Sequence, residues 1–142
     1  MKPSIHVATS FSVALILWFF TKSVYAAFLC LASGVLVDFD HVIEYVLHFG
    51  GKDMNMERIY QACRELLFKK LYLVFHSAEV VIILWVATAL TKNVYILAIA
   101  LGYSSHIILD FIANPLHPFS YFLTRRFIHK FETHKLLRNG KN

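Results

Sequence analysis

The stretch PSIHVATSFSVALILWFFT at residues 3–21 contains no charged side chain and largely decides the fold class. A bilayer core of about 30 Å needs ~20 apolar helical residues, so this stretch is long enough to span it. Three further apolar runs follow at 23–37, 71–91 and 93–109, interrupted only by His76, Glu79 and His106. We predict an all-α, four-helix integral membrane bundle, with the second helix continuing through residues 38–40 toward residue 47.

The composition supports the membrane interpretation. The chain of 142 residues is 58% hydrophobic and 16% charged, with a mean hydropathy of +0.57. Soluble domains carry about 45–50% apolar and about 25% charged residues, and two Cys cannot build a disulfide scaffold. Two other interpretations remain: a cleaved signal peptide, with Lys2 before the apolar run and small residues near Ala26, and a soluble bundle. A chain this short cannot internalise four helices that are apolar all round.

The basic residues predict the orientation. Of the 14 Lys and Arg residues, only Lys22 and Lys92 lie in the short turns between paired apolar runs. All the others lie near the termini or in the 50–70 connection. The positive-inside rule therefore predicts a multi-pass membrane protein with both termini and this connection on the cytoplasmic side.

The two short turns are part of an internal repeat. The sequence TKSVY at 21–25 recurs as TKNVY at 91–95, an offset of 70 residues that also carries His6 onto His76 and Asp40 onto Asp110. We interpret the chain as two repeated helical hairpins, related by an axis along the membrane normal. The alternative is a shared turn sequence without duplication.

Polar residues of different runs are expected at one depth. His6, Asp38, His76, His106 and Asp110 lie 14 to 18 residues from Lys22 or Lys92. At ~1.5 Å per helical residue, all five lie about 21–27 Å from the turns, near the cytoplasmic headgroups. Ionisable residues at membrane depth are costly and indicate a functional site.

The residue types at this depth favour a divalent metal. Imidazole and carboxylate at i, i+3 or i, i+4 spacing share a helix face and suit zinc or a similar ion, here one to three ions. A bound ion would lower the pKa of a water and supply hydroxide as nucleophile. We expect Glu79 or Glu44 to act as a base or to orient a ligand. The predicted ligands are His6, Asp38, Asp40, His41, His76, His106 and Asp110.

The same residues also bear on three other functions. A b-type haem between two His would leave the three Asp without a purpose. A divalent-cation transporter would need polar residues toward the far side of the membrane, where the runs are almost wholly apolar. Motifs of nucleotide cofactors and of nucleophilic serine are absent from the sequence. No other cofactor is predicted.

Three segments resemble the YdjM-like family of bacterial inner-membrane metal-dependent hydrolases. They are GVLVDFDH at 34–41, HS at 76–77 and GYSSHIILD at 102–110, followed by Pro115 and Pro118, so the resemblance extends to about residue 119. The HxxxD pair is also similar to the all-helical, zinc-dependent phospholipase C superfamily. The resemblance implies a metal-dependent hydrolase of the bacterial inner membrane. The family usually carries His-Arg-Gly-x-Thr before its His-Ser, whereas residues 71–75 here are apolar, so a His and an Arg near the metal are missing.

The remaining segments are amphipathic. In the 50–70 connection, Met54 to Lys70 predicts an interfacial helix, and the basic, aromatic tail at 119–142 favours anionic lipid headgroups. We predict one domain at 1–118 and a cytoplasmic tail at 119–142. No nucleic-acid partner is expected. The predicted function is a phosphoric ester hydrolase acting on a lipid phosphate at headgroup level.

Overall fold

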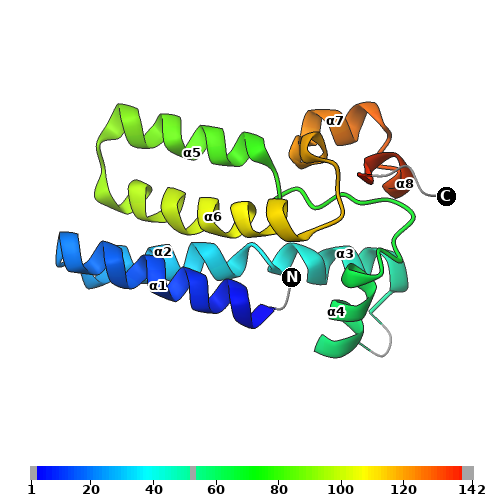
Figure 1. Cartoon of the computed structure of the whole chain (residues 1–142), viewed down its shortest axis with the longest axis horizontal. Helices are drawn as coiled ribbons and strands as arrows, with labels where there is room; N and C mark the ends of the chain where they lie inside the picture. The colour runs from blue at the N-terminus through cyan, green and yellow to red at the C-terminus, as the bar shows by residue number, and fades with distance from the viewer. Residues whose placement is uncertain (1–2, 52–53, 139–142) are drawn as a thin grey trace. The chain divides into compact units, whose positions relative to one another are not determined.

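The computed structural model describes residues 3–51 and 54–138, and every regular element within these ranges is helical. Two isolated β-bridges are the only other pairing there. The prediction of an all-α chain is confirmed for this part (Figure 1). The elements are α1 (Pro3–Thr21), α2 (Val24–Leu36), α3 (Phe39–Phe49), α4 (Met56–Arg64), α5 (Ala78–Thr91), α6 (Val94–Ala113), the 3-10 helix η1 (Pro118–Tyr121), α7 (Leu123–Ile128) and α8 (Thr133–Leu136).

The chain divides into two compact units. Unit 1 contains the residues up to Val37 together with Ala78–Asn114, and unit 2 contains Asp38–Ser77 with the residues from Pro115 onward. Unit 2 thus joins residues on both sides of residue 118, where the sequence analysis placed a boundary. It does so because backbone groups at 68–71 pair with residues 131–133.

Unit 1 consists of two helical hairpins whose turns have the same geometry. Lys22 and Lys92 both adopt a left-handed conformation, with φ of 54° and 51°. In each turn the hydroxyl of the preceding Thr accepts from the backbone N–H two residues on, at 3.3 Å. Ser23 and Asn93 then cap the second helix through their side chains. The repeated sequence therefore forms a repeated turn, while the duplication of the whole hairpins stays a prediction.

Within the described ranges, three helical segments are long and apolar enough to cross a membrane: Pro3–Thr21, Val24–Phe49 and Val94–Ala113. Most of their large side chains face outward; Phe20, for example, is 77% exposed. Apolar side chains exposed on this scale suit a hydrocarbon surrounding rather than water.

The expected helix at 71–91 is wrong in its first seven residues. The helix α5 begins only at Ala78 and has 14 residues, fewer than a membrane span needs. Residues 71–77 run without regular structure, with Leu73 at a φ of 36°. The apolar pattern did not reveal this, because residues 71–75 form an apolar run that lies only two residues before the helix.

Unit 2 is built from α3, α4 and the C-terminal helices. The expected amphipathic helix at 54–70 is shorter than predicted, since α4 ends at Arg64. The tail folds back on itself: Ser120 donates its hydroxyl to Leu136 O at 2.8 Å, and Leu116 and Leu137 form a bridge. The tail is thus part of a packed unit.

Candidate metal centre

Three buried side chains of unit 1 converge at one end of its helices. His6 lies in the first turn of α1, while His106 and Asp110 lie four residues apart on one face of α6. Each is at most 2% exposed. One nitrogen or oxygen atom from each residue lies within 4.8 Å of those from the other two. The sequence expectation that these residues share one depth holds within this unit.

The separations in this group are compatible with a shared metal ion. His6 Nε2 lies 3.2 Å from Asp110 Oδ1, and His106 Nε2 lies 3.5 Å from Asp110 Oδ2. Charge-assisted hydrogen bonds measure about 2.7–2.9 Å. Ligands held at ~2.0–2.1 Å around a tetrahedral ion lie about 3.3 Å apart. The donor set of two imidazoles and a carboxylate therefore fits a divalent ion such as zinc.

The ring of His106 is already oriented for this role. Its Nδ1–H donates to the carbonyl of Gly34 at 2.7 Å, which leaves the Nε2 lone pair on the side of Asp110. A second bond of this kind is typical of metal-ligating His, because it fixes both the tautomer and the ring plane. The ring of His6 stacks on that of His106, with centroids 4.1 Å apart.

Close helix packing brings these groups together. An added Cβ at Gly102 would lie 2.0 Å from Cys30 O, and one at Gly34 would lie 2.3 Å from Ser10 Oγ. Only glycine permits so close an approach of α2 to α6 and α1. Since Gly34 O accepts from His106, this approach also determines the orientation of the imidazole.

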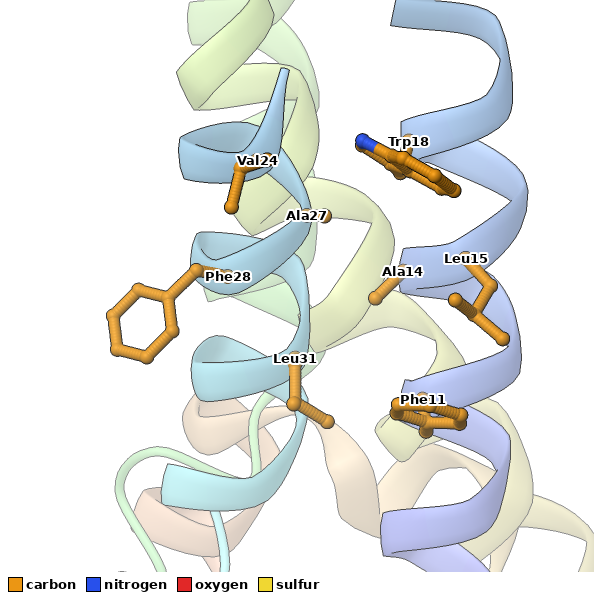
Figure 2. Close-up of a pocket in the computed structure, with 8 residues that line it drawn as sticks. All are labelled: Phe11, Ala14, Leu15, Trp18, Val24, Ala27, Phe28 and Leu31. Atoms are coloured by element: carbon orange, nitrogen blue, oxygen red, sulfur yellow. The ribbon is translucent and has the colours of Figure 1, made fainter. Parts of the chain in front are cut away.

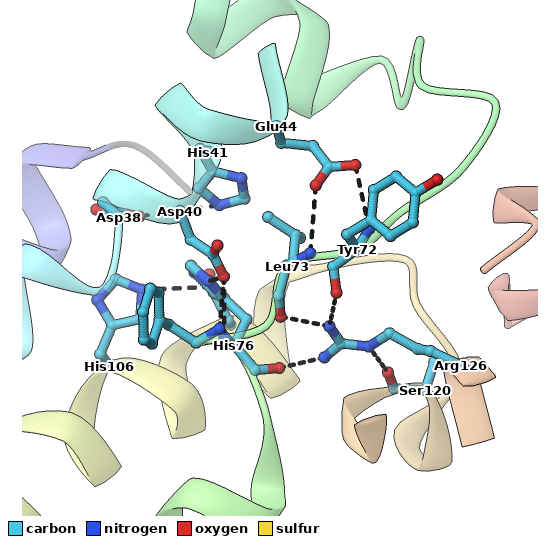
Figure 3. A network of polar contacts seen from close by, with 12 residues as sticks. Asp38, Asp40, His41, Glu44, Tyr72, Leu73, His76, His106, Ser120 and Arg126 are labelled. Atoms are coloured by element: carbon cyan, nitrogen blue, oxygen red, sulfur yellow. Dashed lines mark hydrogen bonds and ion pairs between the residues drawn. The ribbon is translucent and has the colours of Figure 1, made fainter. Parts of the chain in front are cut away.

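Unit 2 gathers a second set of predicted residues (Figure 3). Asp40 Oδ2 accepts from the backbone N–H of Phe75 at 2.7 Å and lies 3.4 Å from His76 Nδ1. The rings of His41 and His76 have centroids 4.6 Å apart. Asp38 Oδ1 lies 3.9 Å from His41 Nε2. Asp40 is thus engaged in orienting His76 and its segment, while Asp38 and His41 are partly exposed.

The two predicted bases differ in their surroundings. Glu44 is buried, and its two oxygens accept from the backbone N–H groups of Tyr72 at 3.1 Å and of Leu73 at 3.3 Å. Glu44 Oε1 also lies 3.6 Å from His48 Nδ1. Glu79 lies in the first turn of α5, in unit 1, and is partly buried. The contacts of Glu44 indicate a structural anchor for the segment at 71–77.

Replacing Glu44 by Gln tests this anchor role. The side-chain NH2 group of Gln would replace one of the two accepting oxygens and would face a backbone N–H group, so that one hydrogen bond is lost. We expect the free energy of unfolding to fall by about 2 kcal/mol. Thermal unfolding in detergent, with Glu57→Gln on the exposed first turn of α4 as control, measures the loss. An unchanged unfolding temperature together with lost turnover would instead make Glu44 a base.

Arg126 is the residue that the sequence analysis missed. It was counted among the basic residues of the tail, yet it is 1% exposed. Its guanidinium donates to the carbonyls of Tyr72 at 2.8 Å and Leu73 at 2.5 Å, and to that of His76. No sequence pattern separates it from its neighbour Arg125, because its partners lie some 50 residues earlier in the chain.

An apolar groove of about 270 Å³ lies between α1 and α2 (Figure 2). Its walls are entirely apolar and include Trp18 and Phe28. The groove belongs to unit 1, as does the group of His6, His106 and Asp110. Its lining suits a hydrocarbon chain.

Together these features define an all-helical protein with three candidate membrane spans and buried His and Asp groups that can bind a metal ion. No family model, curated protein or solved structure matches the chain. The resemblance to the YdjM-like family therefore stays a prediction.

Proposed function

We propose that this protein is a membrane-embedded, metal-dependent hydrolase that cleaves a phosphate ester of a lipid at headgroup level. The observation that carries the proposal is the group of His6, His106 and Asp110. Three buried ligand atoms on two helices lie within 4.8 Å, and one imidazole is fixed by a backbone carbonyl. A buried carboxylate flanked by imidazoles is costly unless a cation compensates its charge.

The residues present would perform distinct tasks. A bound divalent ion supplies a Lewis acid and lowers the pKa of a coordinated water. In unit 1, His6, His106 and Asp110 would hold a divalent ion, and Glu79 in the first turn of α5 remains our proposed base. In unit 2, we propose Asp38, His41 and His76 as further ligands.

In this proposal, Asp40 and Glu44 act through the backbone rather than on the ion. Their oxygens accept N–H groups of residues 72–76. They would fix the segment that carries His76.

A lipid phosphate is the substrate class that the surroundings favour. Three apolar spans, and the groove beside Trp18 and Phe28, suit a substrate with hydrocarbon chains. We propose the bacterial inner membrane as the location and the cytoplasmic leaflet as the side, because all but two of the 14 Lys and Arg residues lie on that side of the predicted topology. Anionic headgroups would bind the same basic residues.

The proposal is tested with purified protein in lipid nanodiscs. After chelation, zinc, manganese or magnesium is added back with phosphatidic acid, phosphatidylglycerol phosphate or a prenyl diphosphate. We expect phosphate release that depends on one of the ions and is lost in Asp110→Asn. Bound metal without turnover, combined with ion flux into liposomes, would favour the transporter. Haem absorbance without divalent metal would overturn both.

A further inference from the structure

The segment at residues 71–77, which we call the strap, carries His76 and has no regular secondary structure. Its backbone groups therefore have no helical partners of their own. Buried backbone N–H and C=O groups need hydrogen bonds, and each unsatisfied one costs free energy. The residues that satisfy them determine where the strap lies.

The N–H groups of the strap bind two carboxylates and one carbonyl of unit 2. Leu71 N donates to Phe131 O at 2.8 Å, and Tyr72 N and Leu73 N donate to Glu44. The N–H groups of Phe75 and His76 donate to Asp40 Oδ2, at 2.7 and 3.3 Å. Two carboxylates thus accept the N–H groups of residues 72, 73, 75 and 76 of the strap.

The carbonyl groups of the strap bind one cation. Arg126 on α7 donates from one terminal nitrogen to Tyr72 O and Leu73 O, and from the other to His76 O (Figure 3). Its Nε donates to Ser120 O at 2.7 Å, which fixes the guanidinium relative to the C-terminal segment that carries it. Glu44, Asp40 and Arg126 are all buried, so water does not replace these bonds.

Only a guanidinium suits this position. It presents five N–H donors in a rigid plane, whereas a Lys ammonium is a point charge with three rotating donors. The three carbonyls belong to residues 72, 73 and 76, so the fork of Arg126 binds both ends of the turn at residues 73–76. That turn contains the left-handed Leu73 and a bond from His76 N to Leu73 O at 3.1 Å.

We propose that Arg126 is a positioning residue that controls metal affinity through His76. By fixing the carbonyl of His76, Arg126 sets the backbone from which the imidazole projects, and Asp40 beside Nδ1 then leaves Nε2 to bind an ion. This inference rests on the proposed function in one respect, namely that His76 is a ligand. The tail would thereby act on the proposed ligand His76 through the backbone of the strap.

The test compares Arg126→Gln with Arg125→Gln in the full chain in nanodiscs. Hydrogen exchange of the strap amides, measured without metal, reports on the position of the strap. Titration with zinc reports on affinity. We expect faster exchange at 71–77 and about 10–100-fold weaker zinc binding for Arg126→Gln, the range typical of residues that orient a ligand. Arg125→Gln should change neither.

A double-mutant cycle separates positioning from general loss of structure. In a His76→Ala background, Arg126→Gln should cause no further loss of zinc affinity, because its effect passes through His76. Additive losses would overturn the proposal, as would unchanged exchange at 71–77 in Arg126→Gln. If the wild-type chain binds none of zinc, manganese and magnesium, the positioning of a metal ligand is overturned together with the proposed function. If the wild type binds zinc but Arg126→Gln binds it equally well, only the role of Arg126 is overturned.

Arg126→Lys provides a graded comparison. The ammonium keeps the charge but cannot span the three carbonyls, so we expect its exchange rates and zinc affinity to lie between those of the wild type and Arg126→Gln. Full restoration by Lys would show that charge alone is needed and would overturn the role of the planar fork.

Discussion

Replacing Asp110 by Asn is expected to weaken zinc binding by at least about 100-fold, the upper end of the range for residues that only orient ligands. The carboxylate lies between two imidazoles, with one oxygen 3.2 Å from His6 Nε2 and the other 3.5 Å from His106 Nε2. Asn keeps the shape but removes the charge that compensates a divalent ion. Elemental analysis and zinc titration of the purified variant measure the effect.

The stability of the same variant gives a second measurement. A ligand present at 100 times its dissociation constant stabilises the native state by about 2.7 kcal/mol. We expect zinc to raise the unfolding temperature of the wild type but not that of Asp110→Asn. The control is Glu57→Gln, which removes an exposed carboxylate from α4. Wild-type metal content in Asp110→Asn would contradict the metal centre.

Replacing Gly102 by Ala is expected to have the second large effect, on folding as well as on the site. The new Cβ would lie 2.0 Å from Cys30 O and 2.4 Å from Ser33 Oγ. Because the nearest atom belongs to the backbone of α2, the helices themselves must separate. Overpacking of this kind costs about 1–3 kcal/mol.

Whether Gly102→Ala raises or lowers the stability distinguishes the effect of packing from that of helix propensity. At an exposed helical position, Ala would be more stable than Gly by about 1 kcal/mol. A lower unfolding temperature for Gly102→Ala therefore reports the helix contact. Zinc affinity should fall as well, because separation of α2 from α6 lengthens the 2.7 Å bond between His106 and Gly34 O.

Two further variants serve as comparisons. At Gly34, the nearest atom to an added Cβ is the Ser10 hydroxyl, a side-chain atom that can turn aside. The nearest backbone atom, Gly102 O, would lie at 2.9 Å rather than the 2.0 Å found at Gly102, so Gly34→Ala should be milder than Gly102→Ala. Ala113→Val adds volume at an exposed position of α6 and should leave zinc binding unchanged. Equal stability of Gly102→Ala and the wild type would contradict the close packing.

Much of the first unit could be predicted from the sequence. The apolar runs predicted α1, α2 and α6 and the second part of the run at 71–91, and the repeated Thr-Lys turns predicted where the hairpins reverse. Counting residues from those turns placed His6 and Asp110 at one depth, and the structure brings them to 3.2 Å. These predictions succeed because hydropathy and helical rise act locally along the chain.

Only the tertiary structure decided the course of the strap and the tasks of the charged residues around it. Residues 71–77 are apolar enough for a helix, yet their N–H and C=O groups bind Glu44, 28 residues earlier than Tyr72, and Arg126, 54 residues later. A buried guanidinium and carboxylates can satisfy an irregular backbone that would otherwise have to be helical. The sequence alone thus determined which segments are apolar and that His6, His106 and Asp110 lie at the ends of their helices away from the Lys turns. Long-range hydrogen bonds decided that Glu44, Asp40 and Arg126 hold the strap that carries His76.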